Sequence, residues 1–307
     1  MRAATWEISP LFPRTHPVIV SMYAKNPRKA ERDFGANPPR LSSSIFSKDN
    51  VLGLFDGTNS HGLIYDLTAE NWTKAKAVAM VEPATLPPAL LTLDAGLTNN
   101  AFAVTVQHPI RNDEALVGHY RASTVLEVVA QPGTQIDFVA VYEDIIWPLI
   151  EALNVREVYA DRWNSAYILR LIETRSKGQV KAFNYSLRSK DFDDFIQFVN
   201  ARQLHLPKIE INPDVAELTI DFKKDLLKYP AAHLYRQFLT VQQYQGMLVK
   251  GSDSTDDIFR ALTLGTTRFF DPKVVERFKK YPNKARGGMS SNAVVLVGTR
   301  GTNYGIR

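Results

Sequence analysis

The stretch from residue 89 to residue 187 most constrains the fold of this 307-residue chain. It opens with three short apolar runs, at 89–95, 101–107 and 116–122, which predict an antiparallel meander of strands. From residue 135 onward, helical and extended patterns alternate, which is typical of parallel strands joined by helices. The sequence therefore predicts an α/β fold with a mixed sheet, an antiparallel meander followed by parallel strands, covered by helices.

The spacing of apolar residues predicts the remaining elements. Val139, Tyr142 and Ile146 recur at intervals of three and four, as on one face of a helix. We expect helices at 135–153, 164–175, 193–201, 214–228 and 255–267, and extended segments at 155–160, 182–187 and 238–250.

The composition excludes several classes of protein. The chain has no cysteine, which excludes disulfides, thiolate zinc sites and cysteine nucleophiles and suits a reducing compartment. With 45% hydrophobic and 22% charged residues, it has enough apolar material for a packed core. No apolar run approaches the roughly 20 residues needed to cross a bilayer, and a signal-peptide pattern is missing. We therefore expect a soluble protein of intracellular type, with no membrane partner.

The net charge of +5 is unevenly distributed. Residues 271–307 hold eight Lys or Arg and two acids, and residues 1–40 hold seven Lys or Arg and three acids, so the middle of the chain is acidic. Basic ends around an acidic centre suit a protein that binds a polyanion near a metal site, although basic termini are also often solvated tails. We hypothesise that residues 271–307 form a basic tail that binds DNA or a partner. The residues expected to contact phosphates are Lys279, Lys280, Lys284 and Arg286, and Arg162 is a further candidate.

Four acids occupy unusual positions. Asp94 lies inside a strand that should be buried, where an unpaired carboxylate is costly. Asp161 ends the strand at 155–160, and Asp256 and Asp257 open the last predicted helix. Each of the last three has an ordinary explanation, either as a helix cap or as a complement to the helix dipole. Asp94 is the hardest to explain in this way, because acids are depleted within strands.

Together these acids predict a metal site. Carboxylate oxygens without nearby cysteine suit Mg²⁺ or Mn²⁺ rather than zinc. Two such ions about 4 Å apart activate water and stabilise the leaving oxygen of a phosphodiester. The sequence therefore favours a metal-dependent hydrolase, provided that the acids meet in the fold.

The same residues resemble the ribonuclease-H-like nuclease domain of the large terminase subunits of tailed bacteriophages. The likeness covers about residues 1–268, and it includes a connector at 1–40 that is similar to the junction of that family's ATPase and nuclease domains, followed by a nuclease domain at 41–270. The motifs that carry it are Asp94-Ala95-Gly96, Tyr159-Ala160-Asp161 and Thr255-Asp256-Asp257, together with 4–10, 26–27 and 32–35 in the connector.

The resemblance implies an endonuclease that uses two Mg²⁺ or Mn²⁺ ions to cut double-stranded viral DNA during genome packaging, with little sequence specificity. Asp94, Asp161 and Asp257 would be the catalytic metal ligands, and Asp256 an auxiliary ligand. It also implies docking to a portal protein and a small terminase subunit, in the host cytoplasm at the procapsid portal. Thr255 is a departure, because His often precedes the paired acids in this family. No G-x-x-x-x-G-K-[ST] motif is present, so we do not predict ATP hydrolysis.

Three alternatives remain open at this point. Holliday-junction resolvases and transposases share the ribonuclease-H-like fold and similar acids. An actin-like sugar kinase or ATPase would use Asp94-Ala95-Gly96 and Asp56-Gly57-Thr58 as phosphate loops, but these motifs are too close in the chain for that fold. A non-catalytic DNA-binding or assembly module would keep the acids for structural reasons.

Overall fold

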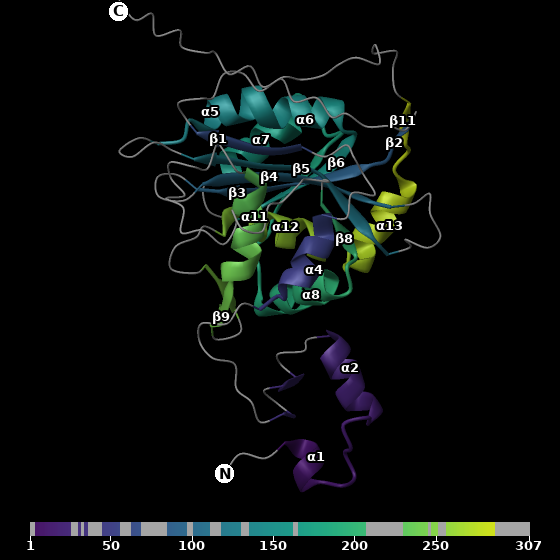
Figure 1. Ribbon diagram of the computed structural model, residues 1–307. Helices are drawn as coiled ribbons and strands as arrows, with labels where there is room; N and C mark the ends of the chain where they lie inside the picture. The colour runs from purple at the N-terminus through teal and green to yellow at the C-terminus, as the bar shows by residue number, and fades with distance from the viewer. Residues whose placement is uncertain are drawn as a thin grey trace, which may run out of the picture.

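A seven-stranded mixed sheet forms the centre of the molecule and carries helices on both faces (Figure 1). The structure is a computed structural model. It describes residues 4–25, 30–31, 34–35, 45–55, 63–68, 85–96, 101–110, 118–129, 135–161, 165–206, 230–244, 247–250 and 256–285.

The sheet follows the order β1-β5-β4-β3-β6-β7, and β8 pairs with β5. Strands β3, β4 and β5 are antiparallel neighbours, whereas β6 runs parallel to β3 and β7 parallel to β6. The strands are β1 (Leu63–Thr68), β3 (Ala89–Ala95), β4 (Phe102–Pro109), β5 (Tyr120–Val129), β6 (Val155–Ala160), β7 (Lys181–Asn184) and β8 (Leu204–His205). A meander followed by parallel strands on its β3 side is the ribonuclease-H-like arrangement, so the predicted fold class is confirmed.

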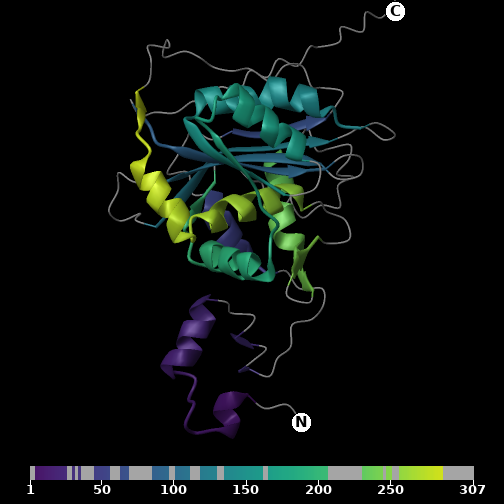
Figure 2. The same cartoon turned by 180° about the vertical axis from the view of Figure 1, so that it is seen from behind.

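Two layers of helices enclose the sheet (Figures 1 and 2). On one face lie α5 (Phe138–Val141), a π-helical turn (Tyr142–Ile146), α6 (Trp147–Ala152) and α7 (Ala166–Arg175). On the other face lie α4 (Lys48–Leu52), a 3₁₀ turn (Gly53–Phe55), α8 (Ser189–Asn200), α11 (Pro230–Thr240) and α12 (Asp257–Arg268).

The alternation of residues along β3 separates the two layers. Leu91 and Leu93 point into the core beneath α5–α7. Thr92 points to the opposite face, where its Oγ1 donates to the backbone oxygen of Ala261 in α12 at 2.8 Å. Asp94 lies on the same face as Thr92, since strand side chains alternate, and it therefore faces α12.

Most predicted elements are confirmed, but two differ. The third strand of the meander, predicted at 116–122, is observed as β5 at residues 120–129. Strands β3 and β6 have the predicted bounds. The segment 238–250, predicted as extended, instead begins with the end of α11, because Leu234 and Phe238 are spaced for a helix and bury their side chains. The rest of that segment forms the hairpin of β9 (Gln242–Tyr244) and β10 (Met247–Val249). The predicted helix at 214–228 lies outside the described residues.

The beginning of the predicted basic tail is folded. Helix α13 (Pro272–Lys280) buries Val274 and Phe278, and Arg277 pairs with the fully buried Glu157 of β6, with Nε 2.6 Å from Oε1. After α13, the short strand β11 (Lys284–Ala285) pairs with β2 (Thr85–Leu86). Residues beyond 285 lie outside the described part of the chain, so a tail function stays a prediction for them.

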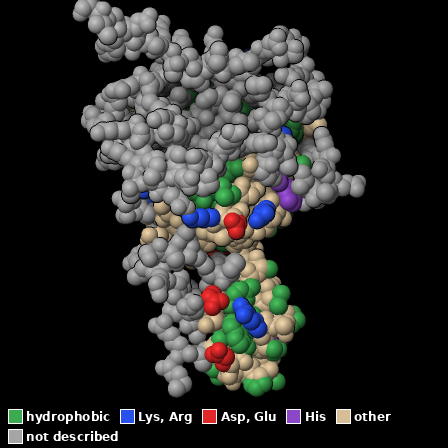
Figure 3. All heavy atoms as spheres, in the orientation of Figure 1, with side chains coloured by type: hydrophobic (Ala, Val, Ile, Leu, Met, Phe, Trp, Pro, Cys, Tyr) green, Lys and Arg blue, Asp and Glu red, His purple; other side chains and the backbone are tan. Residues whose placement is uncertain are grey.

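The N-terminal helices α1 (Thr5–Ile8) and α2 (Pro17–Lys25) lie on the α8 side of the molecule (Figure 1). Ile19 is fully buried, but apolar side chains also reach the surface here (Figure 3). The exposed ones are Ile8, Leu11, Phe12, Val18 and Val20. None of the helices in the described ranges combines the length and apolar character that a bilayer span requires.

Candidate metal centre

The fold brings Asp94 and Asp161 to one edge of the sheet. Strands β3 and β6 are parallel neighbours, and Leu93 pairs in register with Ala160. The residue after each of these, Asp94 and Asp161, therefore stands at the same level, and the backbone N–H of Asp161 donates to Leu93 O at 3.4 Å. Carboxyl ends of adjacent parallel strands are a common place for functional side chains.

Helix α12 begins at this edge and adds two more acids. Asp256 occupies the position just before the helix, and Asp257 is its first residue. The Asp257 side chain is almost fully buried, and its Oδ2 accepts a hydrogen bond from the backbone N–H of Ala101 at 3.3 Å. This contact ties the start of α12 to the beginning of β4, next to Asp94.

Arg260 joins the two strand acids. Its Nε lies 3.2 Å from Asp94 Oδ2, and its Nη2 lies 3.6 Å from Asp161 Oδ2. One guanidinium therefore touches both carboxylates, which shows how near the two acids are. Sequence reasoning did not single out Arg260, although its place one helical turn after Asp256 puts it on the same face of α12.

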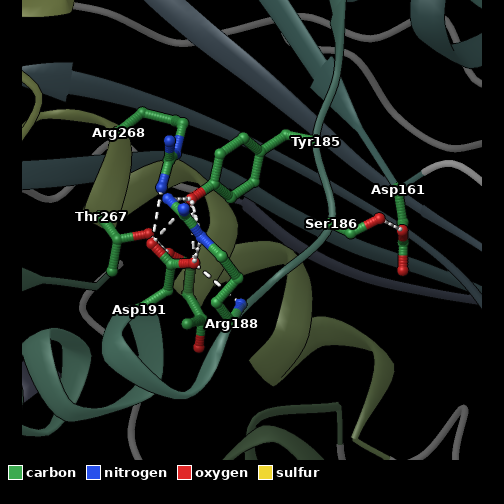
Figure 4. Close-up of polar contacts among 8 residues, drawn as sticks. Asp161, Tyr185, Ser186, Arg188, Asp191, Thr267 and Arg268 are labelled. Atoms are coloured by element: carbon green, nitrogen blue, oxygen red, sulfur yellow. Dashed lines mark hydrogen bonds and ion pairs between the residues drawn. The ribbon is translucent and has the colours of Figure 1, made fainter.

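The second oxygen of Asp161 is held from the other side. Ser186 Oγ donates to Asp161 Oδ1 at 3.0 Å (Figure 4), and Ser165 Oγ donates to the backbone oxygen of Asp161. Ser186 lies in the loop between β7 and α8. The Asp161 carboxylate thus has a contact at each oxygen, which orients it relative to the sheet edge.

The loop that carries Ser186 is anchored by a buried ion pair (Figure 4). Arg268 Nη2 lies 2.7 Å from Asp191 Oδ1, and both side chains are more than nine-tenths buried. Tyr185 OH donates to the same carboxylate, and the Arg268 guanidinium lies 3.4 Å from the centre of the Tyr185 ring. Because Arg268 ends α12 and Asp257 begins it, one helix supports both the acids and the loop beside them.

The carboxylates of the site lie close together, are partly buried and repel one another. Burial raises the pKa of Asp94 to about 6, and Asp256 and Asp161 add to this increase while Arg260 opposes it. Burial also raises the pKa of Asp257, with further increases from the charges of Glu127, Asp94 and Asp256. The pKa of Asp256 is raised as well, mainly by burial. Burial and mutual repulsion therefore disfavour the charged form of these carboxylates, and Arg260 offsets this only in part.

Glu127 is a further acid that sequence reasoning missed. It is fully buried on β5, in a cross-strand row with Ala103 and Asp94. Gln237 Nε2 donates to Glu127 Oε1 at 3.5 Å, and Gln237 Oε1 accepts from the backbone N–H of Phe259 in α12 at 3.1 Å. The signal was present in the sequence, since Glu127 interrupts an apolar strand just as Asp94 does.

The carboxylates of this site are suitable ligands for a hard cation, but in this structure two of them bind the guanidinium of Arg260. Carboxylate oxygens are the ligands that Mg²⁺ or Mn²⁺ prefers. Within the described ranges, no three Asp, Glu or His side chains are placed so that they could hold one metal ion together. Arg260 instead forms an ion pair with one oxygen of Asp94 and one oxygen of Asp161.

The expected DNA-contacting residues are only partly described. Lys279 and Lys280 are exposed on α13, and Lys280 Nζ lies 3.9 Å from Glu276 Oε2. Lys284 lies in β11, and its side chain is outside what the structure describes. Arg162 and Arg286 also lie outside the described residues, so all five remain predictions.

Comparison with known proteins finds structural likeness without sequence similarity. No known protein family and no curated protein matches the sequence. The chain resembles the nuclease domains of large terminases. The large terminase of a thermophilic bacteriophage matches with a TM-score of 0.49 and 12% identity, over 83% of this chain and 53% of that one. This chain thus spans about half the length of that protein.

Two separate nuclease domains are matched over nearly their whole length. The large terminase nuclease of the thermophilic phage G20c, with bound magnesium, gives a TM-score of 0.43 and 11% identity over 75% of this chain and 99% of that one. The Mn-soaked terminase nuclease domain of human cytomegalovirus gives 0.37 and 12% over 78% and 100%.

Proposed function

We propose that this chain is a metal-dependent endonuclease that hydrolyses phosphodiester bonds of double-stranded DNA with little sequence specificity, as in viral genome packaging. One observation carries the proposal: Asp94 and Asp161 lie within reach of one guanidinium at the edge of a ribonuclease-H-like sheet, with Asp256 and Asp257 at the helix start beside them. Acids gathered at such an edge are costly for folding, which favours a functional reason for them.

In this proposal Asp94, Asp161 and Asp257 hold two Mg²⁺ or Mn²⁺ ions, and Asp256 is an auxiliary ligand. Ions held there would supply Lewis-acid chemistry, which would lower the pKa of water and stabilise charge on the leaving 3′ oxygen. The chain's own residues orient the ligands: Ser186 holds Asp161 at Oδ1, and the Ala101 N–H holds Asp257 at Oδ2. Asp94 and Asp161 keep 18% and 19% of their side-chain surface exposed, so a cation can reach them from solvent.

We also propose that basic residues at the C-terminal end position the duplex by phosphate contacts, which carry no sequence information. Lys279 and Lys280 are suitably exposed on α13 for this role. The division into a connector at 1–40, a nuclease domain at 41–270 and a basic segment at 271–307 belongs to the same proposal. So do the portal protein and the small terminase subunit as partners, and the procapsid portal as the site of action.

Plasmid digestion in Mn²⁺ tests the activity. We expect the intact chain to nick and linearise plasmid, and Asp94→Ala and Asp257→Ala to lose cutting by at least about a hundredfold, since a metal ligand is removed. Glu143→Gln is a matched control. It also removes an acid, but Glu143 pairs with Arg175 in the layer of α5–α7, on the opposite face of the sheet from α12. Unchanged cutting by Asp94→Ala would mean that the acids are structural. Much faster cutting of four-way junctions than of linear duplex would indicate a resolvase instead.

A further inference from the structure

Arg260 puts a permanent positive charge between the proposed metal ligands. Its Nε and Nη2 reach Asp94 Oδ2 and Asp161 Oδ2, and the charges of Asp256 and Asp257 attract the same guanidinium. We propose that Arg260 is the resident counter-cation of this site, which positions the carboxylates before a metal arrives and must be displaced from them when a divalent ion binds. The proposal rests on the proposed function, because it concerns the same metal centre.

A guanidinium and a divalent ion compete for the same oxygens. Arg260 uses Oδ2 of each aspartate, at hydrogen-bonding or ion-pair distance. An Mg²⁺ ion binds carboxylate oxygens at about 2.1 Å and requires near-octahedral geometry, so a cation fits there only after the guanidinium withdraws. The guanidinium and a divalent ion carry like charges and would repel each other at this distance, which opposes simultaneous binding.

The local structure allows the exchange without moving the backbone. The Arg260 side chain keeps 27% of its surface exposed, so solvent reaches part of it. Its backbone is fixed in α12, where Arg260 N donates to Asp256 O at 2.8 Å. Asp161 keeps its Ser186 contact at Oδ1 when Oδ2 is released. A rotamer change of one long side chain is therefore enough to vacate the ligand oxygens.

The charge of the site favours the exchange. Asp94, Asp161, Asp256 and Asp257 face one arginine, and Glu127 lies close enough to raise the pKa of Asp257. One guanidinium can offset only part of the charge that these carboxylates carry when ionised, whereas divalent ions neutralise more of it. Arg260 therefore stabilises the metal-free site only in part, and the remaining negative charge draws divalent cations in.

Calorimetric titration of the metal-free full chain with Mn²⁺ alone, at about 150 mM salt, tests the competition. We expect Arg260→Gln to bind Mn²⁺ with a Kd about tenfold lower than the unsubstituted chain, since no cation must leave. Arg260→Lys, which keeps the charge but not the two-pronged contact, should fall between the two. Arg175→Gln removes an equal charge, paired with Glu143 on the opposite face, and should leave the Kd unchanged. An equal or weaker affinity in Arg260→Gln overturns the proposal.

A second measurement observes Arg260 directly in the unsubstituted protein, so it does not depend on whether a variant folds. In ¹⁵N-labelled protein, the Arg260 Nε–H signal should shift as Mg²⁺ is added and saturate together with the calorimetric binding curve. The Nε–H signal of Arg175 should stay in place. An Arg260 signal that does not move while Mg²⁺ saturates the site contradicts displacement.

These outcomes separate this inference from the proposed function. If the unsubstituted chain binds no Mn²⁺, the metal centre itself fails, and the inference fails with it. If the chain binds Mn²⁺ and Asp94→Asn abolishes binding, the metal centre stands. The role of Arg260 then depends only on whether Arg260→Gln tightens binding and whether its Nε–H signal responds.

Discussion

Gly265 of α12 packs directly against Gln107 of β4: a Cβ atom added at residue 265 would lie 2.2 Å from Gln107 Nε2. Gln107 in turn donates to Leu262 O at 3.2 Å and accepts from Thr266 Oγ1 at 2.9 Å. The absence of a side chain at residue 265 lets α12 sit close to the sheet. The same helix carries Asp257, so this contact helps to set the height of the acid above the sheet.

Gly265→Ala should destabilise the protein. The added methyl group displaces the buried Gln107 side chain and breaks its two hydrogen bonds to α12, which outweighs the roughly 1 kcal/mol that alanine gains as a helix former. We expect a net loss of about 2 kcal/mol in the free energy of unfolding. Urea unfolding measures it. The Gly265→Ala, Gln107→Ala double variant should lose less than the sum of the two single losses, and strict additivity would contradict the steric explanation.

Asp94→Asn should stabilise the metal-free protein at pH 8. Burial raises the pKa of Asp94 from 3.8 to about 6, so the folded state holds this proton more tightly than the unfolded chain does. Its ionisation therefore lowers stability as the pH rises from about 4 to about 6, and removing the charge restores up to about 3 kcal/mol above that range. Urea unfolding in EDTA at pH 8 and at pH 4 checks the sign, because the gain should be present at pH 8 and small at pH 4. The variant should also lose any increase in Tm on adding Mn²⁺.

His108→Gln should flatten the acid side of the stability profile. Burial, helped by the nearby Arg121 charge, lowers the pKa of His108 from 6.5 to about 4. The unfolded chain then binds a proton that the folded protein does not, so the free energy of unfolding falls as the pH drops from about 6.5 to about 4. The contribution of this one group is about 3 kcal/mol. Urea unfolding of both proteins at pH 7, 5.5 and 4.5 isolates it, and parallel profiles would contradict the pKa assignment.

Asp191→Ala should be strongly destabilising. The substitution leaves Arg268 as a buried guanidinium without its 2.7 Å ion pair, and breaking such a pair costs about 3–5 kcal/mol. Tyr185 OH loses its acceptor as well. Thermal unfolding measures the loss. Arg188→Ala is the comparison, since that side chain is 71% exposed and lies 3.7 Å from Asp191 Oδ2, and its removal should lower Tm far less.

Replacing Lys279 and Lys280 by glutamine should weaken DNA binding without affecting the fold. Both side chains are exposed on the outer side of α13, whereas Val274 and Phe278 pack inward. Each lost phosphate contact lowers the slope of log K against log salt by about 0.9, so the slope should fall by about 2. Fluorescence anisotropy with a short duplex in Ca²⁺ measures this. Lys177→Gln, at an exposed position just after α7, should leave the slope unchanged, and an unchanged slope in the double variant removes α13 from the DNA-contacting surface.

Local patterns predicted much of the fold. The bounds of β3 and β6 follow from apolar runs of strand length, and the mixed sheet follows from the change between meander and alternation. The predicted extended segment at 238–250 overlaps only the last residues of α11, and the rest of that helix was not predicted. Helix α13 was not predicted, because its many basic residues suggested a solvated tail, although Val274 and Phe278 have helical spacing.

The sequence by itself determined most of the element types and marked Asp94, Asp161, Asp256 and Asp257 as unusual, because strand and helix periodicity depend on residues close together in the chain. Only the tertiary structure placed the Arg260 guanidinium between Asp94 and Asp161, and Glu127 near Asp257. These contacts depend on which strands are neighbours, on their register, and on how closely α12 approaches the sheet. Such long-range geometry is set by the packing of the whole domain, and no short segment of the sequence contains it.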